Sequence, residues 1–97
     1  MFSYNLFEQG SDRMLAVCDD DIIGKSFDTG DIEITVSEFY AGKKAGEKEI
    51  LDIARRSTII NAVGNGIVSL LIKNGLVESS SVLYIGGVKH AQVVSVV

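Results

Sequence analysis

The chain has 97 residues, of which 46% are hydrophobic and 23% charged, with a formal net charge of −4; these figures describe a single domain over residues 1–97 and exclude a two-domain enzyme. One cysteine and one histidine cannot form an internal disulfide or a zinc site within one chain, and an unpaired thiol suits a reducing, cytoplasmic location. Apolar runs such as residues 67–72 are far shorter than the ~20 residues of a membrane-spanning helix, and the first residues lack the basic region of a signal peptide, so we expect no membrane association.

The first third of the chain has the alternating pattern of β-strands. Apolar and polar residues alternate over residues 2–7, and an apolar run at 13–18 follows the turn residues Gly10-Ser11-Asp12. This pattern predicts a hairpin whose second strand is the more buried. We then expect a short helical turn after Asp19-Asp20-Asp21, and a further strand where apolar residues alternate over 32–36.

The middle of the chain has the features of a loop followed by helices. Two glycines and a lysine pair predict a mobile surface loop over residues 39–46. Residues 47–56 have an apolar stripe, an acidic first turn and a basic last turn, which are typical of a helix. We expect a further helical segment over residues 57–63, loosened or broken at Gly64-Asn65-Gly66 and continued over 67–73.

The end of the chain predicts a second hairpin. Residues 82–85 and 88–97 are strand-like and are joined by the two-residue turn Gly86-Gly87. The order of strands, helices and strands predicts an α+β fold, a two-layer sandwich with a mainly antiparallel sheet and helices on one face.

The same hairpin contains a candidate binding site. In the predicted register Leu83 faces His90, and His90 shares one face of the strand with Gln92. The candidate binding residues here are His90, Gln92, Lys89, Gly86 and Gly87. The alternative is a half-buried structural histidine beside a turn that needs glycine.

Ordered sequence blocks run through almost the whole chain. They are Cys18-Asp19 with Ile22-Ile23-Gly24-Lys25 and Phe27, Glu38-Phe39-Tyr40 with Gly42, Val63-Gly64, and Ile85-Gly86-Gly87-Val88 with His90-Ala91-Gln92-Val93-Val94. In this order they resemble an archaeal family known only as a domain of unknown function, the four-two-four family. The resemblance implies a small, stand-alone cytosolic protein with an α+β fold. It implies no activity, cofactor or substrate, so no catalytic residue is carried over.

Three patterns could support chemistry in a small enzyme or metal-binding protein. Asp19-Asp20-Asp21 could bind a hard cation, but consecutive residues point in different directions, so we expect a solvated, capping turn and no metal. Cys18 and His90 could form a nucleophile and its base, but Cys18 ends an apolar strand, and we expect a buried, inert thiol. Gly64-Asn65-Gly66 could present amides to a phosphate, but no strand is predicted before it and the third glycine of a dinucleotide motif is missing. We therefore predict no catalytic residue and no cofactor.

Basic and aromatic residues form a second candidate surface. Residues 1–42 have a net charge of −7 and residues 43–97 a net charge of +3, so part of an acidic protein can be locally positive. Cations interleaved with aromatics can bind RNA through phosphate contacts and base stacking. The candidates are Phe39, Tyr40, Lys43, Lys44 and Lys48. The alternative is an ordinary solvated loop whose aromatics close the core.

These observations predict a non-enzymatic, cytoplasmic binding module, an accessory to archaeal RNA or to a protein of the translation machinery. Its contact surfaces would be residues 39–48 and the terminal hairpin. The competing classes are a small enzyme or metal-binding protein that uses His90 and Asp19-Asp20-Asp21, and a protein-binding adaptor. The adaptor could be a homodimer paired through the apolar residues 93–97.

Overall fold

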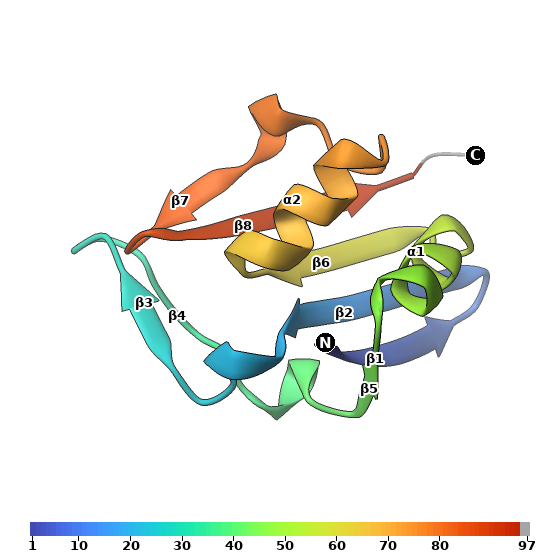
Figure 1. The fold of residues 1–97 in the computed structure, drawn as a ribbon, viewed down its shortest axis with the longest axis horizontal. Coiled ribbons are helices and arrows are strands. Elements are labelled where there is room, and N and C mark those ends of the chain that lie inside the picture. The colour runs from blue at the N-terminus through green and yellow to red at the C-terminus, as the bar shows by residue number, and fades with distance from the viewer. Residues whose placement is uncertain (96–97) are drawn as a thin grey trace.

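A computed structural model of the chain describes residues 1–95 (Figure 1). These residues form eight strands, two α-helices and three short 3-10 helices. In chain order they are β1 (Phe2–Gln9), β2 (Asp12–Asp19), η1 (Asp20–Ile22), β3 (Ser26–Asp28), β4 (Glu33–Thr35), η2 (Glu38–Tyr40), β5 (Lys43–Ala45), α1 (Glu47–Arg55), β6 (Ile59–Val63), α2 (Asn65–Lys73), η3 (Ser79–Ser81), β7 (Leu83–Ile85) and β8 (Val88–Val94). Among residues 1–95, no helix is long and apolar enough to cross a membrane.

Six of the strands form one sheet in the order β5-β1-β2-β6-β8-β7. Every neighbouring pair is antiparallel except β2 and β6, which are parallel. Both predicted hairpins lie in this sheet, and Leu83 pairs with His90 as expected. Residues 96–97 of the predicted last strand lie outside the described residues.

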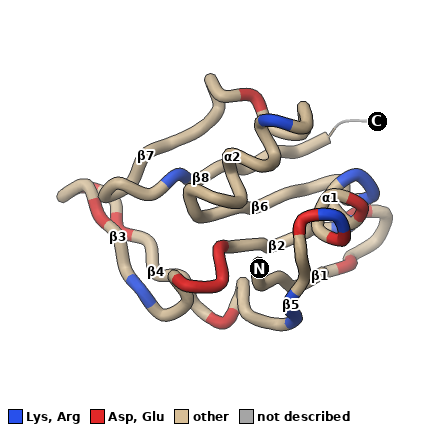
Figure 2. The backbone as a smooth tube through the Cα atoms, in the orientation of Figure 1, with Lys and Arg blue, Asp and Glu red and all other residues tan. Residues whose placement is uncertain are grey.

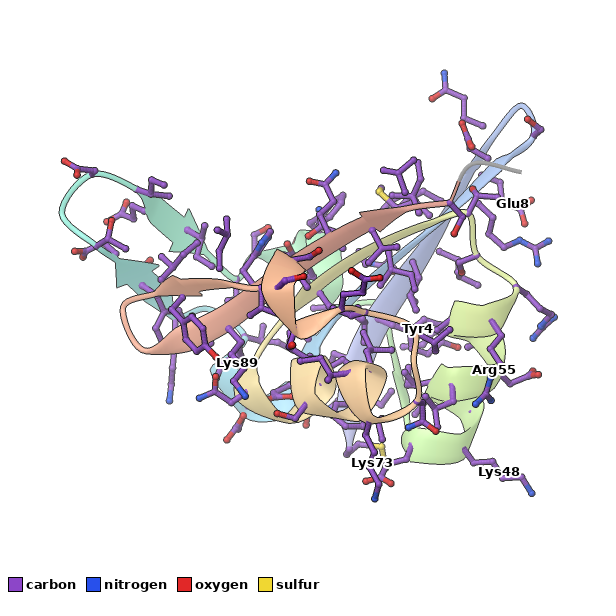
Figure 3. All side chains as sticks on the ribbon, turned by 90° about the horizontal axis from the view of Figure 1, so that it is seen from above. Tyr4, Glu8, Lys48, Arg55, Lys73 and Lys89 are labelled. Carbon is purple, nitrogen blue, oxygen red and sulfur yellow. The ribbon has the colours of Figure 1, made fainter. Side chains whose placement is uncertain are left out.

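Both helices cover the same face of the sheet, here called the helix face (Figure 3). The buried side of α1 consists of Ile50, Ile53 and Ala54, and that of α2 of Ile67, Val68 and Leu71. They pack on a cluster that includes Leu15 and Val17 of β2 and Ile60 and Ala62 of β6. The predicted α+β class, with a mainly antiparallel sheet and helices on one face, is therefore confirmed.

A smaller layer covers one end of the opposite face. It contains the two-stranded sheet β3–β4 with η1 and η2, and its core joins Val36 to Cys18, Val63, Ile85 and Val88 of the main sheet. The strand predicted at 32–36 is therefore shorter, β4, and pairs only with β3. The rest of this face carries no layer of described residues, and we call it the open face.

The helical prediction for residues 57–63 is wrong, because residues 59–63 form the central strand β6. Thr58, Ile59, Ile60 and Val63 are β-branched and favour extended backbone. Ser57, at the start of the predicted helical segment, donates its hydroxyl to the Ile53 carbonyl at the end of α1 (2.8 Å).

Two loop predictions are also corrected. Residues 39–46 are not one surface loop: Phe39 and Tyr40 belong to η2, and residues 43–45 form the edge strand β5 against β1. Gly64-Asn65-Gly66 does not break a helix, because α2 begins at Asn65 directly after β6, with Gly64 at its N-cap.

Candidate binding surface

Four large apolar side chains form one row across the open face. Phe7 pairs with Met14, Met14 with Ile59, and Ile59 with Val94, so the row crosses β1, β2, β6 and β8. Phe7 is 41% exposed and Val94 60%. We call these four residues the apolar row. A cavity of about 250 Å³, lined by Phe7, Gln9, Asp12, Met14 and Ile59, lies over its β1 end.

An aromatic stack extends the apolar row. The rings of Phe7 and Phe39 are parallel to within 11°, with centroids 5.1 Å apart, and Tyr40 meets Phe39 edge-on at the same separation. The Asn5 amide holds this turn in place by donating to the carbonyls of Glu38 (3.1 Å) and Phe39 (3.0 Å). The stack is thus fixed to the sheet by polar contacts beneath it.

The next row toward the covered end carries amides. It consists of Asn5, Ala16, Asn61 and Gln92, which pair in that order across the same four strands. The Tyr40 hydroxyl donates to the Asn61 side-chain oxygen (3.1 Å). Burial raises the pKa of Tyr40, and the electrostatic effect of the nearby Cys18 raises it further. Asn5 and Asn61 therefore anchor η2, whereas Gln92 is exposed at the other end of the row.

The groups proposed for an enzyme do not come together. Cys18 pairs with Val63, and Val63 with His90, so a whole strand separates the thiol from the imidazole. Cys18 is fully buried, and that burial, reinforced by Asp19, Asp20 and Asp21, raises its pKa to about 12. A thiol with this pKa is protonated at neutral pH, and a protonated thiol is a poor nucleophile.

The three consecutive carboxylates diverge. Asp19 accepts the backbone N–H groups of Gly66 (2.9 Å) and Ile67 (2.8 Å) at the start of α2. Asp20 accepts the Ser3 hydroxyl (2.6 Å) and pairs with Lys44, and these contacts lower its pKa. Within residues 1–95, no group of three or more His, Cys, Asp or Glu side chains is arranged to hold a metal ion.

Gly64-Asn65-Gly66 has a structural explanation that the sequence did not reveal. A Cβ atom on Gly64 would lie 2.6 Å from the Asp19 carboxyl carbon, and one on Gly66 would lie 2.9 Å from its oxygen. Asn65 binds the terminal hairpin, accepting the Lys89 N–H (2.9 Å) and donating to the Gly87 carbonyl (3.3 Å). The amides that could have bound a phosphate are therefore occupied by Asp19.

The terminal-hairpin candidates lie on both faces of β8. His90 is half-buried on the open-face side next to Leu83, and burial lowers its pKa. Lys89 points to the helix face, where its ammonium donates to the Ser69 hydroxyl (3.1 Å). Gly86 and Gly87 form the tight turn with φ of 57° and 84°, and a Cβ on Gly86 would lie 2.8 Å from the backbone of Asp28. These two glycines serve the turn and its packing on the β3–β4 hairpin.

The basic candidates are not gathered around the aromatic stack. Lys43 pairs with Tyr4 and so belongs to the helix face, and Lys48 lies on α1 on that side of the sheet (Figure 3). Lys44 lies on the opposite face, where it pairs with Asp20 (3.3 Å). Figure 2 shows a run of acidic residues at η1 and further acidic residues around the β3–β4 hairpin and on α1, while basic residues are scattered along the chain.

The apolar row was not predicted, although the sequence contains its signal. Each of the four strands has two adjacent large apolar residues: Leu6-Phe7, Met14-Leu15, Ile59-Ile60 and Val93-Val94. Alternation sends one member of each pair to the helix face and the other to the open face. Leu6, Leu15, Ile60 and Val93 pair in one row, and their neighbours form the apolar row.

Comparison with known proteins gives a family and a fold. A family model described as a protein of unknown function (DUF424) matches residues 7–96. The crystal structure of an uncharacterized conserved protein from Methanopyrus kandleri is similar over 99% of this chain and 94% of that chain, with a TM-score of 0.77 and 26% sequence identity. No curated protein matches.

Proposed function

The chain belongs to the DUF424 family of proteins of unknown function, and from the geometry above we propose that it is a non-enzymatic module that binds another protein through the apolar row. The observation that carries this proposal is the alignment of four large apolar side chains in one register across four strands, with Phe7 and Val94 exposed and Met14 and Ile59 partly exposed between them. Contiguous exposed apolar surface with a polar rim is typical of protein interfaces.

The separation of the reactive groups supports a non-enzymatic role. Cys18 is buried, and Val63 separates it from His90. Asp19 is engaged at the start of α2 and Asp20 with Ser3 and Lys44. The single buried thiol supports a cytoplasmic site of action, as the composition predicts.

The charge around the apolar row favours a protein over RNA. RNA binding relies on cations that contact phosphates. Among the described strand residues of the open face, the charged side chains that flank the rows are Asp12 and Lys44, and Lys44 is paired with Asp20. Aromatic rings without accompanying cations suit an apolar protein surface better than a phosphate backbone.

Site-specific photo-crosslinking tests this proposal. A benzoylphenylalanine replaces Phe7 in one variant and Leu6 in another; Leu6 is the neighbouring residue of β1, equally exposed at 43%, on the helix face. We expect one protein to be captured from the source lysate through position 7 and not through position 6. The captured protein, made separately, should bind Phe7→Lys at least about tenfold more weakly than Leu6→Lys. Equal capture from both positions, or capture of RNA alone, would contradict the proposal.

A further inference from the structure

The outer edge of β8 is only half paired. β7 pairs with Val88, Lys89 and His90, whereas β8 continues to Val94. Figure 1 shows β7 diverging from β8 toward η3. Within the described part of the chain, no strand pairs with β8 on this side beyond His90.

The register shows which backbone groups face the gap. The Lys89 carbonyl accepts the Gly64 N–H (2.9 Å), so Lys89 directs its backbone toward β6. In an antiparallel ladder, alternate residues direct both of their backbone groups to the same neighbour. Ala91 and Val93 therefore face β6, and Gln92 and Val94 present their N–H and C=O groups to the gap.

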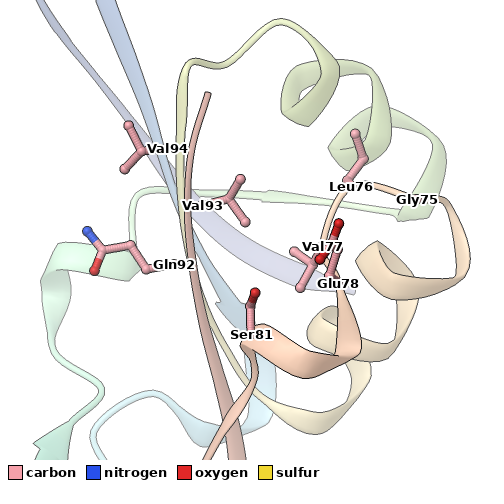
Figure 4. A pocket seen from close by; sticks show the side chains of 8 residues that line it. All are labelled: Gly75, Leu76, Val77, Glu78, Ser81, Gln92, Val93 and Val94. Carbon is pink, nitrogen blue, oxygen red and sulfur yellow. The ribbon is translucent and has the colours of Figure 1, made fainter. Parts of the chain in front are cut away.

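The gap is a groove with a second wall. Its cavity volume is about 360 Å³, and β8 forms one side while the segment between α2 and β7 forms the other (Figure 4). The lining residues are Gly75, Leu76, Val77, Glu78, Ser81, Gln92, Val93 and Val94. The second wall is held by bonds from the Leu76 N–H to the Leu71 carbonyl and from the Ser81 N–H to the Glu78 carbonyl, both 2.9 Å. Val77 is buried, so this wall is part of the folded domain.

We propose that this groove binds one extended segment of a partner protein, which adds to β8 as a further strand and places a lysine or arginine beside Glu78. The free N–H and C=O groups of Gln92 and Val94 match the backbone of an added strand, as in other cases of strand addition. Among the described lining residues Glu78 is the one with a charged side chain, so the segment that complements it is basic.

The second wall argues against a second copy of this chain as the occupant. In a pair of β8 edges, each copy would bring its own segment 75–81 to the place where the other strand must lie. A single extended segment has no such wall. The inference takes from the proposed function only that the partner is a protein. The groove and the apolar row are different surfaces, which meet at Val94.

Peptide selection tests the inference without a known partner. The probe is a displayed library of random linear peptides, selected on the unaltered protein. We expect the selected peptides to be rich in β-branched residues with a lysine or arginine. Gln92→Pro should weaken their binding at least about tenfold, because proline removes the N–H that faces the groove.

The controls separate strand addition from unfolding. Proline is tolerated where a strand N–H faces away from the sheet, so Gln92→Pro should keep its cooperative unfolding, and Val94→Pro provides the same block at a second position. Gln92→Thr retains the N–H and should bind normally. Glu78→Lys should shift the selection toward acidic peptides.

Four outcomes would overturn the inference: no peptide selected, binding that survives both proline substitutions, selected peptides without a charge preference, or self-association that Gln92→Pro abolishes. The last outcome would identify a second copy as the occupant. Phe7→Lys should leave peptide binding in the groove unchanged. A fifth outcome is loss of binding to the crosslinked partner in Phe7→Lys but not in Gln92→Pro, which would keep the proposed function and reject the groove.

Discussion

The carboxylate of Asp19, at the end of β2, accepts the backbone N–H of Gly66 in the first turn of α2 at 2.9 Å, across 47 residues of sequence. A second bond from the Ile67 N–H completes the contact. The first N–H groups of a helix have no partner within the helix, and the helix dipole favours a negative charge there. Asp19 thus acts as a helix cap supplied from the neighbouring strand.

Loss of this cap should destabilise the protein. We expect Asp19→Ala to lower the free energy of unfolding by about 2 kcal/mol, because two hydrogen bonds to a charged acceptor are removed. Asp21→Ala is the matched control, since Asp21 is exposed and makes no side-chain hydrogen bond to the described residues; it should change stability by less than about 0.5 kcal/mol. Urea unfolding measures both values, and equal effects would show that Asp19 is not a cap.

The glycine at the N-cap of α2 should be equally sensitive. Gly64 has φ of 129°, and a Cβ there would overlap the Asp19 side chain. We expect Gly64→Ala to cost about 2–4 kcal/mol through backbone strain and this overlap. Gly46, the N-cap of α1, has φ of −85° and no atom within 4 Å of its added Cβ, so Gly46→Ala should be nearly neutral. A small effect at Gly64 in thermal unfolding would contradict the close approach.

The elements that the sequence predicted correctly are those with local signals. The two hairpins have turn residues between alternating strands, and α1 has its charges and apolar stripe within nine residues. The strand β6 was missed because it is apolar on both faces: Ile60 and Ala62 contact the helices, whereas Val63 contacts the smaller layer. A short apolar run without alternation does not distinguish a buried strand from a buried helix.

The candidate surface was missed for a related reason. Gly86, Gly87 and His90 were singled out from their own segment, and their register was predicted correctly. The apolar row exists only because β2 and β6 pair in parallel and bring Met14 beside Ile59. Nothing local to either strand specifies that pairing. Contacts of this kind, like the one between Asp19 and Gly66, depend on the fold as a whole.

The buried thiol gives a prediction about alkaline pH. Burial raises the pKa of Cys18 to about 12, above the usual value near 9. The folded protein therefore retains a proton that the unfolded chain loses, so this group's contribution to stability declines as pH rises above about 9. We expect a disulfide reagent to leave Cys18 unmodified in the native protein and to react after unfolding in urea. Cys18→Ala should reduce the alkaline loss of stability, and rapid reaction of the native thiol would contradict its burial.

The predicted RNA interaction can be tested on three lysines. If RNA binds and Lys43, Lys44 and Lys48 all contact phosphate, their joint replacement by alanine should flatten the salt dependence of log K by up to ~3 units. Lys44 lies on the opposite face of the sheet from Lys43, so we expect a change of about 1–2 units on any single RNA site. Filter binding at several salt concentrations measures the slope. No binding by the unaltered protein at low salt would rule out the RNA interaction.

His90 provides a test that separates a structural residue from a contact residue. It is half-buried between Val63 and Leu83, and its imidazole makes no hydrogen bond to the described residues. Burial lowers its pKa below the usual value near 6.5, so the unfolded chain takes up the proton first and stability falls as pH drops below that value. His90→Asn should remove this acid-side loss. It should also reduce stability at neutral pH by about 1 kcal/mol, because the ring packs against apolar neighbours.

Urea unfolding at about pH 7.5 and about pH 5.5, for the unaltered protein and for His90→Asn, measures both effects of this substitution. Gln92→Asn is the matched control, since Gln92 lies two residues along on the same face of β8 and is exposed. The affinity for the crosslinked partner is then measured with the same two variants. If His90 is structural, His90→Asn should have a lower free energy of unfolding and an unchanged affinity for the partner. If its free energy of unfolding is unchanged and its affinity for the partner is lost, the imidazole belongs to the interface, and the binding surface extends from the apolar row to the terminal hairpin.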